Sequence, residues 1–193
     1  MVFNLKNIPL SVKVMAVTKN RSEKEISEVL SRGIKIIGEN RIQESPKIPG
    51  VKKHFIGHLQ SNKVKKAVEN YDVIETVDSL KLAEKISNAG GCKIFIQVNI
   101  SREPQKSGAA PENLEDLIQK IKKLQNLELT GLMAIIENTN DPQKRLAQFR
   151  KMKDLQEKYS LSELSMGMSN DWEEAIESGA TIIRLGRILF ENA

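Results

Sequence analysis

The chain has little cysteine, few aromatic residues and no long hydrophobic run. Cys92 is the only cysteine among 193 residues, which excludes an internal disulfide and a Cys-x-x-Cys metal or redox site. No apolar run approaches the roughly 20 residues of a membrane-spanning helix. The residues after Met1 also lack the basic segment and the apolar stretch of a secretory signal. We therefore expect a cytoplasmic protein that does not enter a membrane.

The composition supports one sizeable core. Hydrophobic residues make up 39% of the chain and charged residues 28%, with both signs mixed along the sequence, which excludes disordered and fibrous classes. The net charge of +5 favours anionic partners without selecting a nucleic acid, a membrane surface or a phosphorylated metabolite. Because no linker or repeat interrupts the chain, we expect residues 1–193 to form a single domain.

Short β-rich runs alternate with stretches whose apolar residues recur every three or four positions, as in repeated βα units. The eight runs are Lys13–Lys19, Ile34–Asn40, His54–His58, Asp72–Val77, Lys93–Asn99, Leu129–Ile135, Glu163–Gly167 and Thr181–Gly186. No Gly-x-Gly-x-x-Gly turn follows the first run, which disfavours an open doubly wound sheet. The pattern predicts an α/β protein with a (β/α)8 TIM barrel, more compact than the usual barrel of about 250 residues.

Start signals support the helices between these runs. Ser22 and Glu25 form a possible capping box, and Asp141 precedes Pro142 as a cap before a second helix. The segment 45–50 contains two prolines and a glycine, so we expect one helix to be reduced to a turn there.

Polar residues at the ends of the strands are the candidates for function, because barrel enzymes build their sites at the carboxyl ends of the strands. Ser169 and Gly186 lie in the loops after the seventh and eighth runs, where barrels often bind phosphate. For Ser169, the alternative interpretation is a helix cap made by Asn170 and Glu173.

Lys19 ends the otherwise apolar first strand, where partial desolvation would favour a neutral amine that can attack an aldehyde. The alternative is an ordinary solvated charge. An amine on the first strand and a phosphate cradle on the last two match the aldehyde and the phosphate of pyridoxal 5'-phosphate (PLP).

Five ordered segments resemble the YggS/PROSC family of pyridoxal phosphate homeostasis proteins, and the resemblance covers nearly the whole chain. The segments are Ala16–Lys19, Gly38–Glu44, His54–Lys63, Leu164–Asp171 and Ile183–Gly186. The resemblance implies a barrel like the N-terminal domain of alanine racemase, in which Lys19 carries PLP as an internal aldimine, a Schiff base.

The resemblance also implies roles for the other site residues. Ser169 and the amide of Gly186 would hold the phosphate, Asn40 would lie near the ring, and Arg184 would face the pyridine nitrogen. Members of the family have no established catalysis, which implies that the protein buffers PLP or delivers it to apo PLP-dependent enzymes. The sequence departs from the family in a missing or reduced helix before the first strand and in Arg187, where a small hydroxyl residue is common.

A weak PLP-dependent racemase or lyase is the alternative function. A permanently cationic Arg184 at the ring nitrogen would weaken the electron sink, and racemisation needs a second acid or base. Tyr71, Tyr159 and Cys92 are expected to lie away from the site. His58 is the one titratable candidate at a strand end, although a bond to a nearby backbone carbonyl is an equal alternative for it.

Two further lysine features complete the sequence. Lys106 is a second candidate amine for holding the cofactor, with an exposed loop lysine as the alternative. Lys52–Lys53 and Lys63–Lys66 would serve RNA binding, but aromatic residues make up only 4% of the chain and no stacking motif accompanies these lysines. We expect no nucleic-acid partner, no metal site and a monomeric state.

Overall fold

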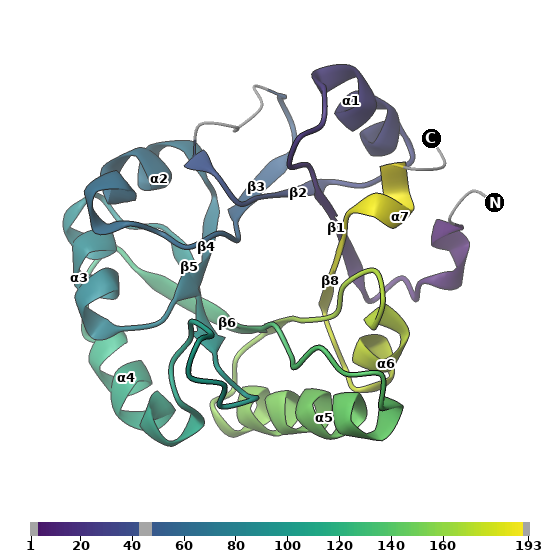
Figure 1. Ribbon diagram of the computed structural model, residues 1–193. Helices are drawn as coiled ribbons and strands as arrows, with labels where there is room; N and C mark the ends of the chain where they lie inside the picture. Colours follow the sequence, from purple (N-terminus) through teal and green to yellow (C-terminus); the bar gives the residue numbers. More distant parts are fainter. Residues whose placement is uncertain (1–3, 43–47, 191–193) are drawn as a thin grey trace.

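The computed structural model describes residues 4–42 and 48–190, which form a closed barrel of eight parallel strands inside a ring of helices (Figure 1). The strands are β1 Lys13–Val17, β2 Ile36–Glu39, β3 Lys52–Phe55, β4 Val73–Val77, β5 Lys93–Val98, β6 Glu128–Ala134, β7 Glu163–Ser165 and β8 Ile182–Leu185. They follow chain order around the barrel, and β8 pairs with β1 to close it. Each predicted run overlaps one of these strands, so the predicted TIM barrel is confirmed.

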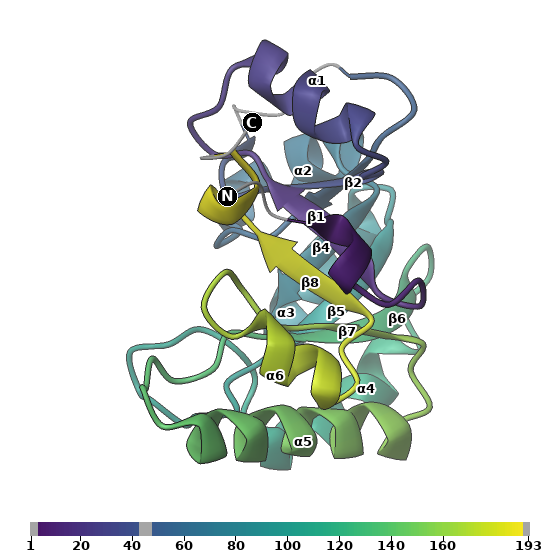
Figure 2. The same ribbon diagram turned by 90° about the vertical axis from the view of Figure 1, so that its right-hand side faces the viewer.

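Helices of very different lengths cover the outside of the barrel (Figures 1 and 2). The α-helices are α1 Glu23–Ser31, α2 Val64–Asn70, α3 Leu80–Asn88, α4 Leu114–Ile121, α5 Pro142–Lys158, α6 Trp172–Glu177 and α7 Arg187–Phe190, and the 3-10 helices are η1 Leu5–Asn7, η3 Ser61–Lys63 and η4 Pro111–Asn113. The shortness of α6 and α7 is one reason why a barrel fits into a chain of this length.

The predicted helix starts are confirmed at α1 and α5. The hydroxyl of Ser22 accepts a hydrogen bond from the Glu25 amide, and the Glu25 carboxylate accepts one from the Ser22 amide at 2.8 Å. At α5, the Asp141 carboxylate accepts hydrogen bonds from the first amides of the helix, and Pro142 occupies the first turn. These side chains satisfy amide groups that have no partner inside a helix.

Two sequence expectations concern the segments around β1 and β2. Before β1, the described residues contain only η1, which agrees with a reduced N-terminal helix. Half of the segment 45–50, expected to be a turn, lies outside the described residues; its last two residues, Pro49 and Gly50, do form a turn. No helix in the described part of the chain is long and apolar enough to span a lipid bilayer.

The inside of the barrel is layered. An apolar layer is formed by the buried side chains of Met15, Ile36, Val73, Phe95, Met133 and Ile182. Side chains alternate between the two faces of a strand, so residues two positions further along β5 and β8 also point inward. Those positions hold Gln97 and Arg184. The chain continues from them to the carboxyl ends of the strands, which lie at the front of Figure 1. A polar layer therefore lies between the apolar layer and the carboxyl ends of the strands.

Candidate functional site

Lys19 lies at the carboxyl end of β1. The last paired residue of β1 is Val17, opposite Gly38 of β2, and Lys19 follows two positions later with an exposed side chain. This differs from the expected partial desolvation, because the chain has already left the paired part of the barrel at Lys19. The buried Thr18 hydroxyl donates a hydrogen bond to the buried carboxylate of Glu39, which joins the ends of β1 and β2 directly beside Lys19.

Asn40 follows β2 and is half-buried against the end of β3. A Cβ atom at Gly57 would lie only 2.0 Å from the carbonyl oxygen of Asn40, so this close approach requires glycine. His58 is exposed, and the described part of the chain gives its ring no hydrogen-bond partner, so the alternative of a bond to a backbone carbonyl is not observed. The ends of β2 and β3 thus present an amide and an imidazole side chain at the same end of the barrel as Lys19.

The loop after β7 is not arranged as a helix cap by Asn170. The N-cap residue of α6 is Asp171, and its side chain makes no capping bond to the helix. Its buried carboxylate instead accepts a hydrogen bond from the Met168 amide, so it closes the loop rather than the helix, and burial raises the pKa of this carboxyl group. The alternative interpretation of Ser169 and Asn170 as part of a capping box is therefore wrong.

Ser169 and Gly186 lie in the segments that follow two neighbouring strands of the barrel. Ser169 is half-buried in the loop after β7, and Gly186 directly follows β8. A Cβ atom at Gly186 would meet only the Cβ atom of Val17, at 3.8 Å, so the space beside this glycine is open. Because β8 pairs with β1, this open space lies on the strand next to the one that carries Lys19.

Arg184 is buried in the polar layer, below the carboxyl ends of the strands. One terminal nitrogen of its buried guanidinium donates to the Ser165 carbonyl at 2.8 Å and to the Ser165 hydroxyl at 2.9 Å, and the other donates to the Ala134 carbonyl at 2.7 Å. Burial lowers the pKa of the guanidinium, while the nearby carboxylates of Glu75 and Asp171 act in the opposite direction. The three hydrogen bonds fix the guanidinium inside the barrel.

Sequence reasoning missed two residues of the polar layer, His54 and Glu75. The Nδ1 atom of His54 lies 2.6 Å from the Oε1 atom of Glu75, and both side chains are buried. The signal for Glu75 was present in the sequence, since a carboxylate in the middle of the apolar run Val73–Val77 is costly to bury unless it is paired.

The side chains of Asn99 and Lys106 form hydrogen bonds that stabilise the loop after β5. The Asn99 side-chain amide donates to the carbonyls of Glu103 and Lys106. The ammonium of Lys106 forms an ion pair with Glu103 and donates to the carbonyl of Ile136. Lys106 is therefore half-buried and bonded, rather than the exposed loop lysine of the alternative interpretation.

The three other acid–base candidates pack outside the barrel strands. Tyr71 is buried against Phe55, and its hydroxyl donates to the Arg41 carbonyl at 3.2 Å. Tyr159 packs against the outer core beneath the Lys158 ammonium. Burial raises the pKa of the Cys92 thiol to about 12, which leaves it protonated at neutral pH.

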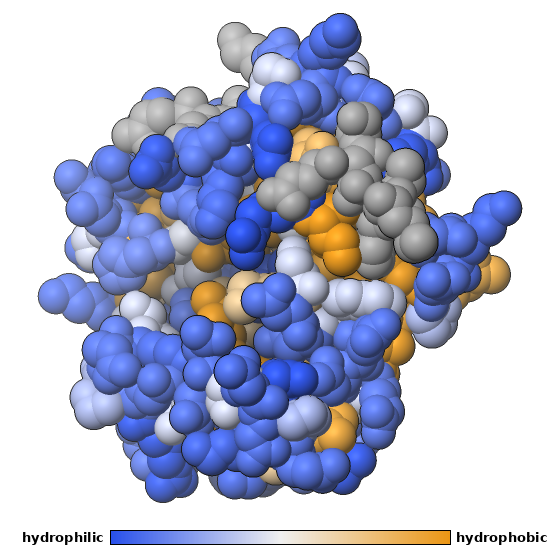
Figure 3. Space-filling model, turned by 45° about the vertical axis from the view of Figure 1, so that its right-hand side comes forward, coloured by the Kyte–Doolittle hydropathy of each residue, from blue (hydrophilic) through white to orange (hydrophobic). Residues whose placement is uncertain are grey.

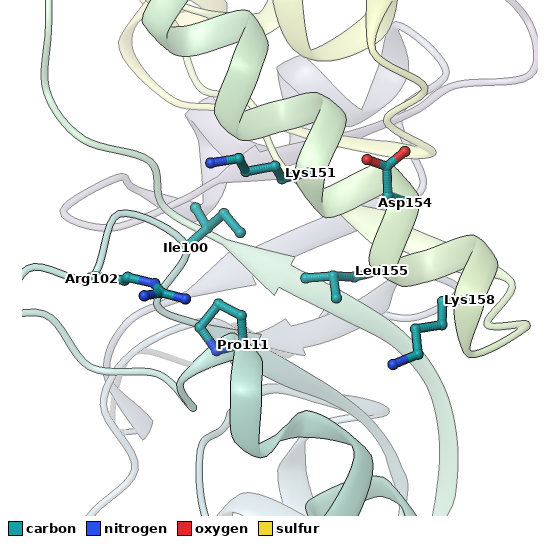
Figure 4. Close-up of a pocket in the computed structure, with 7 residues that line it drawn as sticks. All are labelled: Ile100, Arg102, Pro111, Lys151, Asp154, Leu155 and Lys158. Carbon is teal, nitrogen blue, oxygen red and sulfur yellow. The ribbon is translucent and has the colours of Figure 1, made fainter.

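Two hollows lie on other parts of the surface. A hollow of about 350 Å³ lies beside α5, with Lys151, Leu155 and Lys158 of this helix on one side and Ile100, Arg102 and Pro111 on the other (Figure 4). A second, of about 520 Å³, lies beside the amino ends of β1 and β2. Neither is lined by a residue expected to hold the cofactor.

The face in Figure 3 is mainly hydrophilic, with small apolar patches, one of them near its middle.

Comparisons with known proteins match this fold over nearly its whole length. Residues 4–192 match the family described as alanine racemase, N-terminal domain. A pyridoxal phosphate homeostasis protein of Synechocystis is 40% identical, covering 95% of this chain and 92% of the relative. A protein of the same name from Vibrio cholerae is 38% identical, covering 93% of this chain and 85% of the relative.

A solved structure with the same architecture is PipY of Synechococcus elongatus. Without PLP, PipY is 36% identical to this chain, with a TM-score of 0.89 and coverage of 96% of this chain and 95% of PipY. PipY with PLP bound gives a TM-score of 0.87 at 35% identity, with the same coverage. The chain thus belongs to the alanine racemase N-terminal domain family, among the pyridoxal phosphate homeostasis proteins.

Proposed function

We propose that this protein binds PLP and buffers it or delivers it to apo PLP-dependent enzymes, with Lys19 as the point of covalent attachment. One observation carries the proposal: the exposed Lys19 follows the end of β1, and the open space at Gly186 follows the end of the adjacent strand β8. When bound, PLP supplies an aldehyde that an amine can capture and a ring that accepts electrons. The PLP-bound structure of PipY supports this ligand.

The phosphate would lie between the ends of β7 and β8. Ser169 offers a hydroxyl donor there, and Gly186 lets an anion approach the backbone amide closely. Arg187 follows with an exposed side chain and adds positive charge near the same loop. The donor set of a hydroxyl, a backbone amide and a nearby cation suits a phosphate group.

The ring would lie over the floor made by Arg184, with Asn40 at its edge. The guanidinium is always charged and donates only, so it suits an unprotonated pyridine nitrogen as its partner. Ile135 and Met168, which follow β6 and β7, are each 38% exposed and offer apolar surface near these strand ends. A planar aromatic ring matches this combination of a polar floor and apolar walls.

We further propose that the protein does not catalyse a reaction and that it is a cytoplasmic monomer. The bonded Tyr71 and the protonated Cys92 thiol support the absence of a second acid or base, and the relatives are named homeostasis proteins. A weak racemase or lyase is the second candidate, favoured by the exposed imidazole of His58 at the end of β3. Formation of D-alanine from L-alanine by the PLP-bound protein, lost in Lys19→Ala, would favour that candidate.

Replacement of Lys19 tests the attachment. We expect Lys19→Ala to lose the visible absorption of bound PLP and the adduct that borohydride traps, because no amine remains at this strand end. The measurements are absorption spectra and mass spectrometry of peptides after reduction. The control is Lys24→Ala, which removes an exposed lysine of α1. A trapped adduct on another residue of the Lys19→Ala protein would contradict the assignment.

A further inference from the structure

Two opposite charges are buried inside the barrel. Glu75 lies on β4 and Arg184 on β8, which stand on opposite sides of a ring of eight strands. Glu75 is 0% exposed and Arg184 is 4% exposed. A charge buried in this way is costly unless an opposite charge compensates it, so each of these groups needs a counter-charge within the barrel.

The hydrogen bonds of Arg184 do not supply that counter-charge. Its partners are the two oxygens of Ser165 and the carbonyl of Ala134, all of which are neutral. They fix where the guanidinium lies, but they leave its charge unbalanced. The compensation has to come from carboxylates inside or beside the barrel.

Glu75 and Asp171 are the carboxylates that act on Arg184, and Glu75 is the stronger of the two. The carboxylate of Asp171 closes the loop after β7 through the Met168 amide, and burial raises its pKa. The carboxylate of Glu75 accepts no hydrogen bond from a backbone amide of the described residues. This carboxylate points into the same interior as Arg184, because Glu75 lies two residues after Val73 of the apolar layer and is fully buried, so we take it as the main counter-charge to Arg184.

His54 orients the Glu75 carboxylate. Its Nδ1 atom bonds Oε1 of Glu75 at 2.6 Å, and its ring stands edge-on to Phe95 of the apolar layer, with 6.1 Å between the ring centroids. The second carboxylate oxygen of Glu75 has no hydrogen-bond partner within the described part of the chain. One carboxylate oxygen is thus bonded to the imidazole, while the other makes no hydrogen bond that would compete with its electrostatic attraction to Arg184.

We propose that Glu75 is a positioning residue of the cofactor site: held by His54, it balances the charge of Arg184 and sets the electrostatic potential at the ring end of the bound cofactor. This inference rests on the proposed function. The negative charge of a carboxylate below the ring raises the pKa of a titrating group on the bound cofactor, whereas the positive charge of Arg184 lowers that pKa. Among the described residues, Glu75 and Asp171 are the carboxylates that act on Arg184, and His54 bonds Glu75.

The charge pairing can be tested in the cofactor-free protein by a double-mutant cycle of Glu75→Gln and Arg184→Met. We expect Glu75→Gln to lower the urea midpoint of unfolding, and Arg184→Met to destabilise the Glu75→Gln protein much less than it destabilises the unmodified protein. Such coupling is the sign of a direct interaction. If the two effects simply add, the pairing does not exist and the inference fails.

The effect on the cofactor is tested by titrating the visible absorption of the PLP-bound protein with pH. We expect Glu75→Gln to move the transition to lower pH by about one unit, a tenfold change in the proton equilibrium. Glu75→Asp keeps the charge and should stay close to the original midpoint. Glu128→Gln is the control, because it removes an exposed carboxylate at the start of β6.

The possible failures are distinguishable. If the unmodified protein binds no PLP, the proposed function fails, and the cycle in the cofactor-free protein still decides the pairing. If PLP binds and the Glu75→Gln transition does not move, the role of Glu75 at the ring fails while the proposed function stands. If Glu75→Gln does not fold, Glu75→Asp decides, since a midpoint shifted as far as one unit would show that the retained charge does not set the potential.

Discussion

At the scale of single residues, the hydroxyl of Ser169 is the simplest test of the phosphate site. We expect Ser169→Ala to weaken PLP binding by about 1 kcal/mol, the usual contribution of one hydrogen bond, or roughly fivefold in Kd. Equilibrium dialysis or the visible absorption of the bound cofactor measures this loss. Ser27→Ala, on the exposed face of α1, should bind PLP as the unmodified protein does. Equal affinities of Ser169→Ala and Ser27→Ala would remove Ser169 from the site.

Some residues of the candidate site are predictable one by one, and others are not. Lys19 and Gly186 follow from their places at strand ends, because the topology of a barrel alone brings those ends together. The pair of His54 and Glu75 is harder to predict, since each residue is an isolated polar group in its own strand and the register of the pairing between β3 and β4 brings them to 2.6 Å. The capping interpretation at Asn170 failed because Asp171, one residue later, turns its side chain into the loop.

At the scale of elements, the start of α1 makes a prediction about pH. The pKa of Glu25 is lowered from 4.5 to about 2, first by its hydrogen bond from the Ser22 amide, then by the Ser22 hydroxyl and by Arg21. A lowered pKa in the folded state stabilises the fold above the unfolded value, and this contribution is lost as the pH falls from 4.5 to about 2.

We expect Ser22→Ala to raise the pKa of Glu25 part of the way back to its ordinary value, because the hydroxyl donor is lost while the amide donor remains. An NMR titration of the Glu25 carboxyl group measures this change. Ser27→Ala, within the same helix, should leave the titration in place. A Glu25 midpoint that is the same in both variants would show that the hydroxyl does not act on the carboxylate.

A second prediction at this scale concerns the contact between the ends of β2 and β3. We expect Gly57→Ala to lower the free energy of unfolding by about 1–3 kcal/mol, because the new methyl group would overlap the Asn40 carbonyl and force the strands apart. Urea unfolding measures the effect. Gly186→Ala is the matched control, since its methyl group would enter open space. Equal stability of these two variants would show that the strand ends yield without cost.

The elements were the most predictable part of the structure. A strand buried on both faces reads as an apolar run bounded by polar residues, and β5 and β8 come close to that pattern. β3 departs from it, because it begins with Lys52 and Lys53. The exact ends of the strands were less predictable, as at β1, which stops at Val17 rather than Lys19. The Thr18 amide still donates to the Gly38 carbonyl of β2 at 3.2 Å, but Thr18 and Lys19 lie beyond the strand, so the polar end of the run does not mark where β1 stops.

At the scale of the whole molecule, the repeat of strand and helix is enough to predict closure of the barrel. Each strand pairs with its sequence neighbours, and the first pairs with the last. The polar layer is a property of the closed ring that no single unit contains. Its members come from strands as distant as β3 and β8, so a reading of one unit at a time cannot assemble it.

The net charge of +5 also acts at this scale. A positive protein attracts the phosphate of PLP, and salt screens that attraction over a Debye length of about 8 Å at physiological ionic strength. We expect the association rate of PLP to fall about twofold or more between about 0.01 and 0.15 M salt, measured by stopped-flow absorption. Pyridoxal, which lacks the phosphate, is the control. An equal salt dependence for both compounds would show that the phosphate is not steered by the protein charge.

The only tryptophan of the chain opens α6, directly after the loop that carries Ser169. An indole in that place is a built-in optical reporter, because a bound chromophore near the loop would quench its fluorescence by energy transfer. Arrival and departure of the vitamin can therefore be followed in real time with the unlabelled native protein, including during transfer to an acceptor enzyme that contains no tryptophan of its own.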